Sequence, residues 1–127
     1  MKKNYFLTLI LTLFISGLSF GQVIITELAD PTNNAGARFV EIYNVSDSDV
    51  DLTDWELRRL TNANTEPQGT GIDLTPLGTL TSGSFAIIAA NGTTFSSVYG
   101  INADIIAGTG GAVDSNGDDK IAIFDAS

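Results

Sequence analysis

The chain has 127 residues, enough for one domain, and its 15 acidic and 6 basic residues give a net charge of −9. Such a surface repels nucleic-acid phosphates and anionic lipid headgroups, so neither direct nucleic-acid binding nor a peripheral-membrane role is expected. The sequence contains no cysteine and no histidine, which excludes disulfides, thiol nucleophiles, thiolate metal sites and imidazole bases.

The first 21 residues have the layout of a secretory signal peptide. Lys2 and Lys3 give a positive start, residues 5–15 are apolar, and Ser19-Phe20-Gly21 places small residues around a cleavage point. The apolar run is shorter than the roughly 20 residues that span a bilayer, so no membrane span is expected once the signal is removed. We expect a secreted, extracellular or cell-surface protein that begins at Gln22. Loss of Lys2 and Lys3 takes the basic residues from 6 to 4 and the net charge from −9 to −11.

The first half of the remaining chain alternates between apolar and turn-forming segments. Within the second apolar segment, Val40 and Ile42 fall on one face and Glu41 and Tyr43 on the other, the period of two that a half-buried strand requires. The predicted elements are a strand at 23–28, a turn at 30–36, a strand at 39–45, a turn at 46–49 and a strand at 55–60.

The second half continues as short strands and loops. Apolar residues between 72 and 80 have a spacing that a helix would also show, but Pro76 and Gly78 argue against a helix, and a bent extended segment is predicted. Asn91-Gly92 is a favoured turn pair that ends the apolar run before it. The remaining predictions are a loop at 62–71, strands at 85–90 and 120–124, an extended piece at 101–106, and a flexible loop at 108–111, with 93–99 left open between loop and one turn of helix.

Short strands separated by turns, without a helical repeat, indicate an all-β fold, either a sandwich or a barrel. The length and the single tryptophan, Trp55, favour an immunoglobulin-like antiparallel β-sandwich. Trp55 is predicted to place its ring in the core, near Val40, Ile42 and Leu57.

A weak calcium site is predicted at residues 114–119. Asp114, Asn116 and Asp118 carry oxygen ligands at alternate positions, as at the start of a calcium loop. The sixth position, however, holds Asp119 where such a loop needs glycine, and Asp125 stands where it needs glutamate. The alternative is a hairpin turn at Asn116-Gly117, and no other cofactor is indicated.

Structural roles are predicted for two further polar features, Asn44 and the pair Arg58-Arg59. Asn44 stands at the end of a strand, where a turn-forming role is favoured over recognition. Arg58-Arg59 is a basic pair in an acidic chain, and pairing with Glu56 or another carboxylate is favoured over contact with a partner.

The chain resembles the lamin-tail domain, an immunoglobulin-like module of nuclear lamins and of many secreted bacterial proteins. The resemblance rests on five segments in order, IITEL, FVEIYN, DLTDWELRR, LTSGSFAIIAANG and NGDDKIAIFD, and extends from Val23 to Asp125. It implies one such domain over 22–127. The sequence stops after Phe124-Asp125-Ala126-Ser127, where the family turns and usually continues, so a truncated domain or the first module of a longer protein is expected.

Three function classes remain open. The resemblance implies a non-catalytic extracellular interaction or structural module, accessory to a larger secreted protein such as a nuclease or hydrolase, with an unknown protein or surface partner. The acidic residues suggest the alternative of a calcium-binding adhesive cell-surface module. A small hydrolase with paired carboxylates is least favoured, because no nucleophile with an adjacent base can be named. We therefore expect that the domain is not an enzyme.

Overall fold

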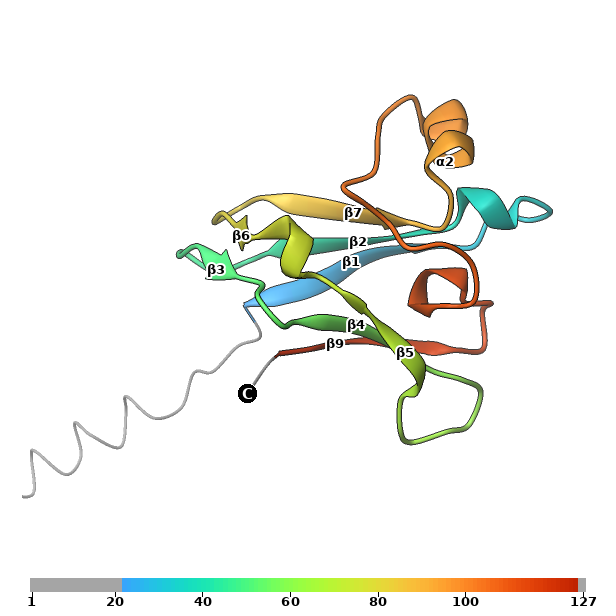
Figure 1. Ribbon diagram of the computed structural model, residues 1–127, viewed down its shortest axis with the longest axis horizontal. Coiled ribbons are helices and arrows are strands. Elements are labelled where there is room, and N and C mark those ends of the chain that lie inside the picture. Colours follow the sequence, from blue (N-terminus) through green and yellow to red (C-terminus); the bar gives the residue numbers. More distant parts are fainter. Residues whose placement is uncertain (1–21, 126–127) are drawn as a thin grey trace, which may run out of the picture.

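The computed structural model describes residues 22–125, which form two facing β-sheets with a short helix on the outside (Figure 1). The predicted signal peptide, residues 1–21, lies outside the described residues. The four-stranded sheet has the order β1-β2-β7-β8 and the three-stranded sheet the order β5-β4-β9, while β3 and β6 pair at one end. The strands are β1 (Val23–Ala29), β2 (Phe39–Asn44), β3 (Val50–Asp51), β4 (Glu56–Leu60), β5 (Gln68–Asp73), β6 (Thr79–Leu80), β7 (Phe85–Ala89), β8 (Ile105–Ile106) and β9 (Lys120–Phe124).

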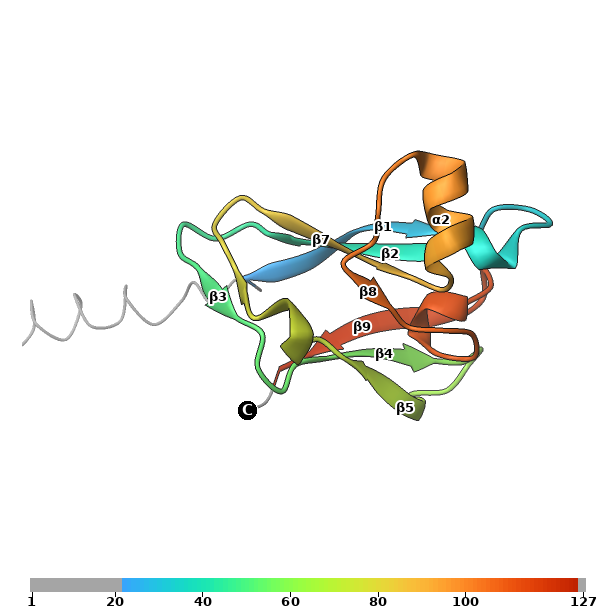
Figure 2. The same ribbon diagram turned by 45° about the horizontal axis from the view of Figure 1, so that its top comes forward.

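The predicted all-β sandwich is confirmed, and its strand pairs are antiparallel with the exception, within residues 22–125, of β7 and β8. Figure 2 shows the two sheets as separate layers, with β1, β2, β7 and β8 above β4, β5 and β9. The β7–β8 pair is parallel because the chain between these strands makes a crossover that includes the helix, as parallel neighbours require.

The main core lies between the two layers. Val40 and Ile42 of β2 are fully buried, as the alternation predicted, and Ile88 of β7 and Leu57 of β4 join them in the same cluster. Trp55 is only half-buried and packs against this cluster from its margin. The prediction that Trp55 packs in the core is confirmed in part: the cluster it packs against contains its predicted neighbours Val40, Ile42 and Leu57, but Trp55 lies just before β4 and stays partly exposed.

A second, smaller core lies on the outer face of the four-stranded sheet. The helix α2 (Gly92–Tyr99) places Phe95 against Phe39, Ile87 and Ala89. The rings of Phe39 and Phe95 meet edge to face, with their centroids 5.3 Å apart. Strand β7 is consequently buried on both faces, which explains why its sequence is a continuous apolar run without alternation.

The segment left open at 93–99 is an α-helix, and its ends follow capping rules. Asn91 accepts a hydrogen bond from the Thr94 backbone N–H at 2.9 Å, and Gly100 ends the helix with a φ of 75°. The prediction of a simple turn at Asn91-Gly92 is therefore wrong, because Asn91 acts as the helix N-cap.

Strand β5 of the three-stranded sheet begins earlier than predicted. It starts at Gln68, inside the predicted loop 62–71, and pairs with β4. A Cβ atom at position 71 would lie 2.5 Å from the Arg58 side chain. Glycine at this position therefore allows the Glu56–Arg58 ion pair to lie directly against the backbone of β5. The bent segment at 72–80 is confirmed as the end of β5, a 3₁₀ turn at Thr75–Leu77 and β6.

Candidate functional site

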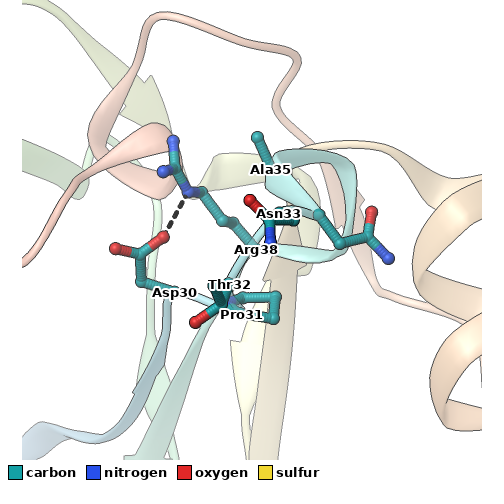
Figure 3. Close-up of a pocket in the computed structure, with 7 residues that line it drawn as sticks. Asp30, Pro31, Thr32, Asn33, Ala35 and Arg38 are labelled. Atoms are coloured by element: carbon teal, nitrogen blue, oxygen red, sulfur yellow. Dashed lines mark hydrogen bonds and ion pairs between the residues drawn. The ribbon is translucent and has the colours of Figure 1, made fainter.

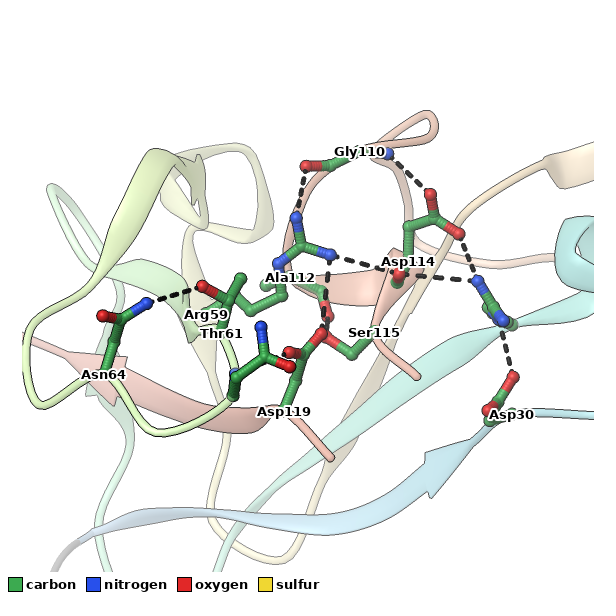
Figure 4. A network of polar contacts seen from close by, with 11 residues as sticks. Asp30, Arg59, Thr61, Asn64, Gly110, Ala112, Asp114, Ser115 and Asp119 are labelled. Atoms are coloured by element: carbon green, nitrogen blue, oxygen red, sulfur yellow. Dashed lines mark hydrogen bonds and ion pairs between the residues drawn. The ribbon is translucent and has the colours of Figure 1, made fainter. Parts of the chain in front are cut away.

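A cluster of charged residues closes one end of the sandwich. Arg38 precedes β2 and donates from Nε to Asp30 Oδ1 at 2.7 Å and from Nη1 to Asp114 Oδ1 at 2.6 Å. Asp114 ends a 3₁₀ helix, Ala112–Asp114. The Arg38 guanidinium thus joins Asp30, which follows the first strand, to Asp114, which lies 76 residues after Arg38 in the chain. Figure 4 shows these contacts together with those of Arg59.

Arg59, on β4, holds the same segment from the opposite sheet. Its guanidinium donates to the carbonyl oxygens of Asp114 at 3.2 Å and Gly110 at 3.1 Å, and lies 3.7 Å from Asp119 Oδ2. Between these contacts, Ala112 and Val113 enter the main core. We call Arg38, Arg59, Asp30, Asp114 and Asp119 the arginine cluster; it fixes the segment that fills the end of the sandwich.

The charges of the arginine cluster stabilise one another. The hydrogen bond to Asp114, followed by that to Asp30, raises the pKa of Arg38 above its ordinary value. Partial burial alone would raise the pKa of Asp114, but the Gly110 N–H and the Arg38 guanidinium outweigh it and lower that pKa. The Asp114 carboxylate is therefore ionised and bound by Arg38 and the Gly110 N–H within the same domain.

In the predicted calcium site, Asp114 is held by other partners, and only Asn116 and Asp118 contact each other. Asp114 faces the two arginines, whose positive charges disfavour a cation there. When its amide is oriented to donate, Asn116 Nδ2 lies 2.7 Å from Asp118 Oδ1. Residues 22–125 contain no group of three or more acidic, histidine or cysteine side chains that could hold a metal ion. The calcium site stays a prediction.

A β-turn, and not a hairpin, occupies residues 116–119. The Asp119 N–H donates to the Asn116 carbonyl at 3.0 Å, and β9 begins at the next residue. The predicted hairpin turn at Asn116-Gly117 is wrong because a 3₁₀ helix, and no strand, precedes the turn.

Asn44 is a fully buried polar residue at the end of β2. Its Nδ2 donates to the carbonyls of Ser48 and Leu80, each at 2.8 Å. Its Oδ1 accepts from Ser46 N–H at 3.0 Å and Ser46 Oγ at 2.7 Å. The turn-forming role is confirmed, and the bond to Leu80 also attaches β6 to this turn.

Arg58 pairs with Glu56 on β4 at 2.7 Å, as predicted for this arginine. Arg38 and Asp30, by contrast, were not predicted as a pair. The available signal was an arginine placed between a turn and a strand, eight residues after an aspartate that also borders a strand.

Two shallow depressions border this end of the molecule. The first, of about 450 Å³, is formed by the 30–38 loop, and Figure 3 shows the Asp30–Arg38 contact beside Pro31 and Asn33. Because Arg38 is already paired with two carboxylates, this depression offers no unpaired charge. The second, of about 410 Å³, runs beside α2 and is lined by Thr93, Ser96 and Asn102 among others.

The two facing sheets and the order of their strands are consistent with an immunoglobulin-like β-sandwich, and its charged residues pair with one another inside the domain. The Lamin Tail Domain family matches residues 18–127. The chain therefore belongs to the lamin tail domain family, a family of immunoglobulin-like domains that are generally non-catalytic. A search of curated proteins finds no match. Within residues 22–125, no helix has the length and apolar character needed to cross a membrane.

Proposed function

We propose that this domain is a non-catalytic extracellular interaction or structural module, accessory to a larger secreted protein such as a nuclease or hydrolase. Family membership over residues 18–127 carries the proposal. The arginine cluster supports it, because Asp114 and both arginines serve to hold the sandwich together. The N-terminal layout of Lys2, Lys3 and an apolar run supports export.

The location and the context are tested by fractionating the host and detecting the domain with an antibody. We expect it in the medium or at the cell surface, in a band heavier than the 13.4 kDa of this chain. A band confined to the cytoplasm would contradict export. A band of about the chain's own mass would contradict the accessory role.

The non-catalytic role is tested separately on the purified chain, with nucleic acid, peptide and glycan substrates. We expect no turnover. An activity that copurifies with the chain and disappears in a single carboxylate variant, such as Asp118→Asn, would contradict the proposal. The matched control is Asp47→Asn, which removes another exposed carboxylate outside the arginine cluster.

A further inference from the structure

The chain contains the dipeptide Asn-Gly twice, and the structure places the two copies in different settings. Asn91-Gly92 opens α2, whereas Asn116-Gly117 lies in the exposed β-turn before β9. In an Asn-Gly pair the glycine nitrogen can attack the asparagine side-chain amide, because no Cβ on the glycine hinders the approach. This reaction converts asparagine to an acid and needs no enzyme.

The turn leaves the reacting atoms of Asn116 and Gly117 free to meet. Both residues are exposed, and a Cβ built on Gly117 would have open space around it. The Gly117 N–H forms no hydrogen bond within residues 22–125. The Asn116 side-chain amide lies near Asp118 and Asp119 of the same turn, and no other element among the described residues holds it.

Asn91 is exposed as well, but the fold holds its side chain. Its Oδ1 accepts the Thr94 N–H at 2.9 Å, and its carbonyl accepts the Phe95 N–H at 2.9 Å. Gly92 packs so closely on Ile106 that a Cβ there would lie 2.8 Å from that side chain. Attack of the Gly92 nitrogen on Asn91 therefore requires that the N-cap and the first turn of α2 open.

We propose that Asn116 is a site of spontaneous deamidation in the folded protein, with water as the co-reactant, and that Asn91 is protected. The Gly117 nitrogen gives its proton to solvent and bonds to Asn116 Cγ, while the Cγ–Nδ2 bond breaks and that nitrogen takes up a proton and leaves as ammonia. Water then opens the resulting succinimide ring. Cleavage of the new N–Cγ bond gives aspartate, and cleavage of the original peptide bond gives isoaspartate, in which the main chain runs through Cβ and Cγ.

Isoaspartate changes the turn because it lengthens the backbone between two fixed points. On one side Ser115 is buried, and its hydroxyl donates to the Ala112 carbonyl at 2.6 Å. On the other side Asp119 Oδ1 accepts the Asn62 N–H at 3.1 Å, and Asp119 Oδ2 lies 3.7 Å from Arg59 Nη1. An added methylene between these points displaces Asp119, so the Asn62 N–H loses its acceptor.

Incubation of the purified chain at mildly alkaline pH, followed by mass spectrometry with fragmentation, measures both sites in one sample. We expect Asn116 to gain the mass difference between an amide and an acid at least about fivefold faster than Asn91, the factor that corresponds to the opening of a helix N-cap. In urea the two rates should converge, because the fold then holds neither side chain.

Gly117→Ala is the matched variant. The open space around Gly117 and a φ outside the left-handed region allow alanine to fit, so the variant keeps the fold while its Cβ hinders attack on Asn116. We expect slower deamidation at Asn116 and an unchanged rate at Asn91. A rate at Asn91 that equals or exceeds that at Asn116 in the folded chain, reaction at Asn116 only in urea, or an unchanged rate at Asn116 in Gly117→Ala would overturn the proposal.

Hydrogen exchange at the Asn62 amide tests the consequence for the turn. Deamidated protein that contains isoaspartate should exchange this N–H faster than the parent. Asn116→Asp adds the same charge without lengthening the backbone, so it should keep the protection of the parent. Equal exchange in parent and deamidated protein, or equally fast exchange in Asn116→Asp, would overturn the displacement of Asp119.

Discussion

Replacing Asn44 with alanine tests the link between the end of β2, the following turn and β6. The substitution removes four hydrogen bonds of a side chain that is 0% exposed. Each neutral bond contributes about 1 kcal/mol on balance, so their sum is about 4 kcal/mol. The carbonyl of Leu80 also loses a donor in a buried region, which adds to the cost. We therefore expect Asn44→Ala to reduce the free energy of unfolding by about 3–5 kcal/mol.

Urea unfolding followed by the fluorescence of Trp55 measures this change. Because total stability is typically about 5–15 kcal/mol, the variant should unfold at a much lower urea concentration than the parent. The control is Asn64→Ala, which removes one hydrogen bond at an exposed position and should change stability by no more than about 0.5 kcal/mol.

A loss below about 1 kcal/mol in Asn44→Ala would refute the reasoning. It would mean that water replaces the amide at the carbonyls of Ser48 and Leu80. Asn44→Asp sharpens the test because it keeps the size of the side chain but turns both carbonyls toward a carboxylate, so it should be at least as destabilising as alanine.

Four further outcomes are expected. Asp114→Asn should lower the free energy of unfolding by about 1–3 kcal/mol at neutral pH. Because the folded-state pKa of Asp114 is lowered, the difference between parent and variant should vanish as pH falls through that pKa, and a difference that persists in acid would contradict this prediction. Trp55→Ala should cost about 2 kcal/mol, less than the roughly 3–5 kcal/mol of a fully buried ring, and a variant that melts like the parent would place Trp55 on the surface. Calcium at ten times its dissociation constant should raise the free energy of unfolding by about 1.4 kcal/mol if the predicted site binds it. Thermal melts of the parent and of Asp118→Asn, with several millimolar calcium and with chelator, test this, and an equal shift in both proteins would exclude the calcium site and leave residues 116–119 as a turn. Mass spectrometry should find an exported chain that starts within a few residues of Gln22, whereas exported protein that retains Met1 would contradict cleavage.

The sequence was sufficient to predict a strand such as β2, in which apolar and polar residues alternate. Val40 and Ile42 alternate with Glu41 and Tyr43, and β2 lies where that pattern placed it. The helix was harder to predict because Asn91-Gly92 fits both a turn and a helix N-cap. The choice between them depends on Phe95 packing against β7 and β2, a contact that local sequence does not encode.

The arginine cluster shows the same limit for polar contacts. Outside the cluster, Arg58 pairs with Glu56 two residues earlier on the same strand, and this pairing could be predicted from the sequence. Arg38 reaches Asp114 across 76 positions, so only the arrangement of the two sheets brings them together. The exposure of Trp55 likewise depends on where the turn before β4 meets the core margin.

The double-sided burial of β7 also affects how the chain behaves before it folds. An unfolded chain exposes residues 85–90, an apolar run without charge or proline, which is the composition of segments that aggregate through cross-β pairing. No nearby charge interrupts it, since residues 74–103 contain no Asp, Glu, Lys or Arg. Strand β2, its partner on one side, lies some forty residues earlier in the chain, whereas α2 follows at once and covers its outer face. Early docking of α2 would therefore shield β7 from other chains while the slower pairing with β2 is completed.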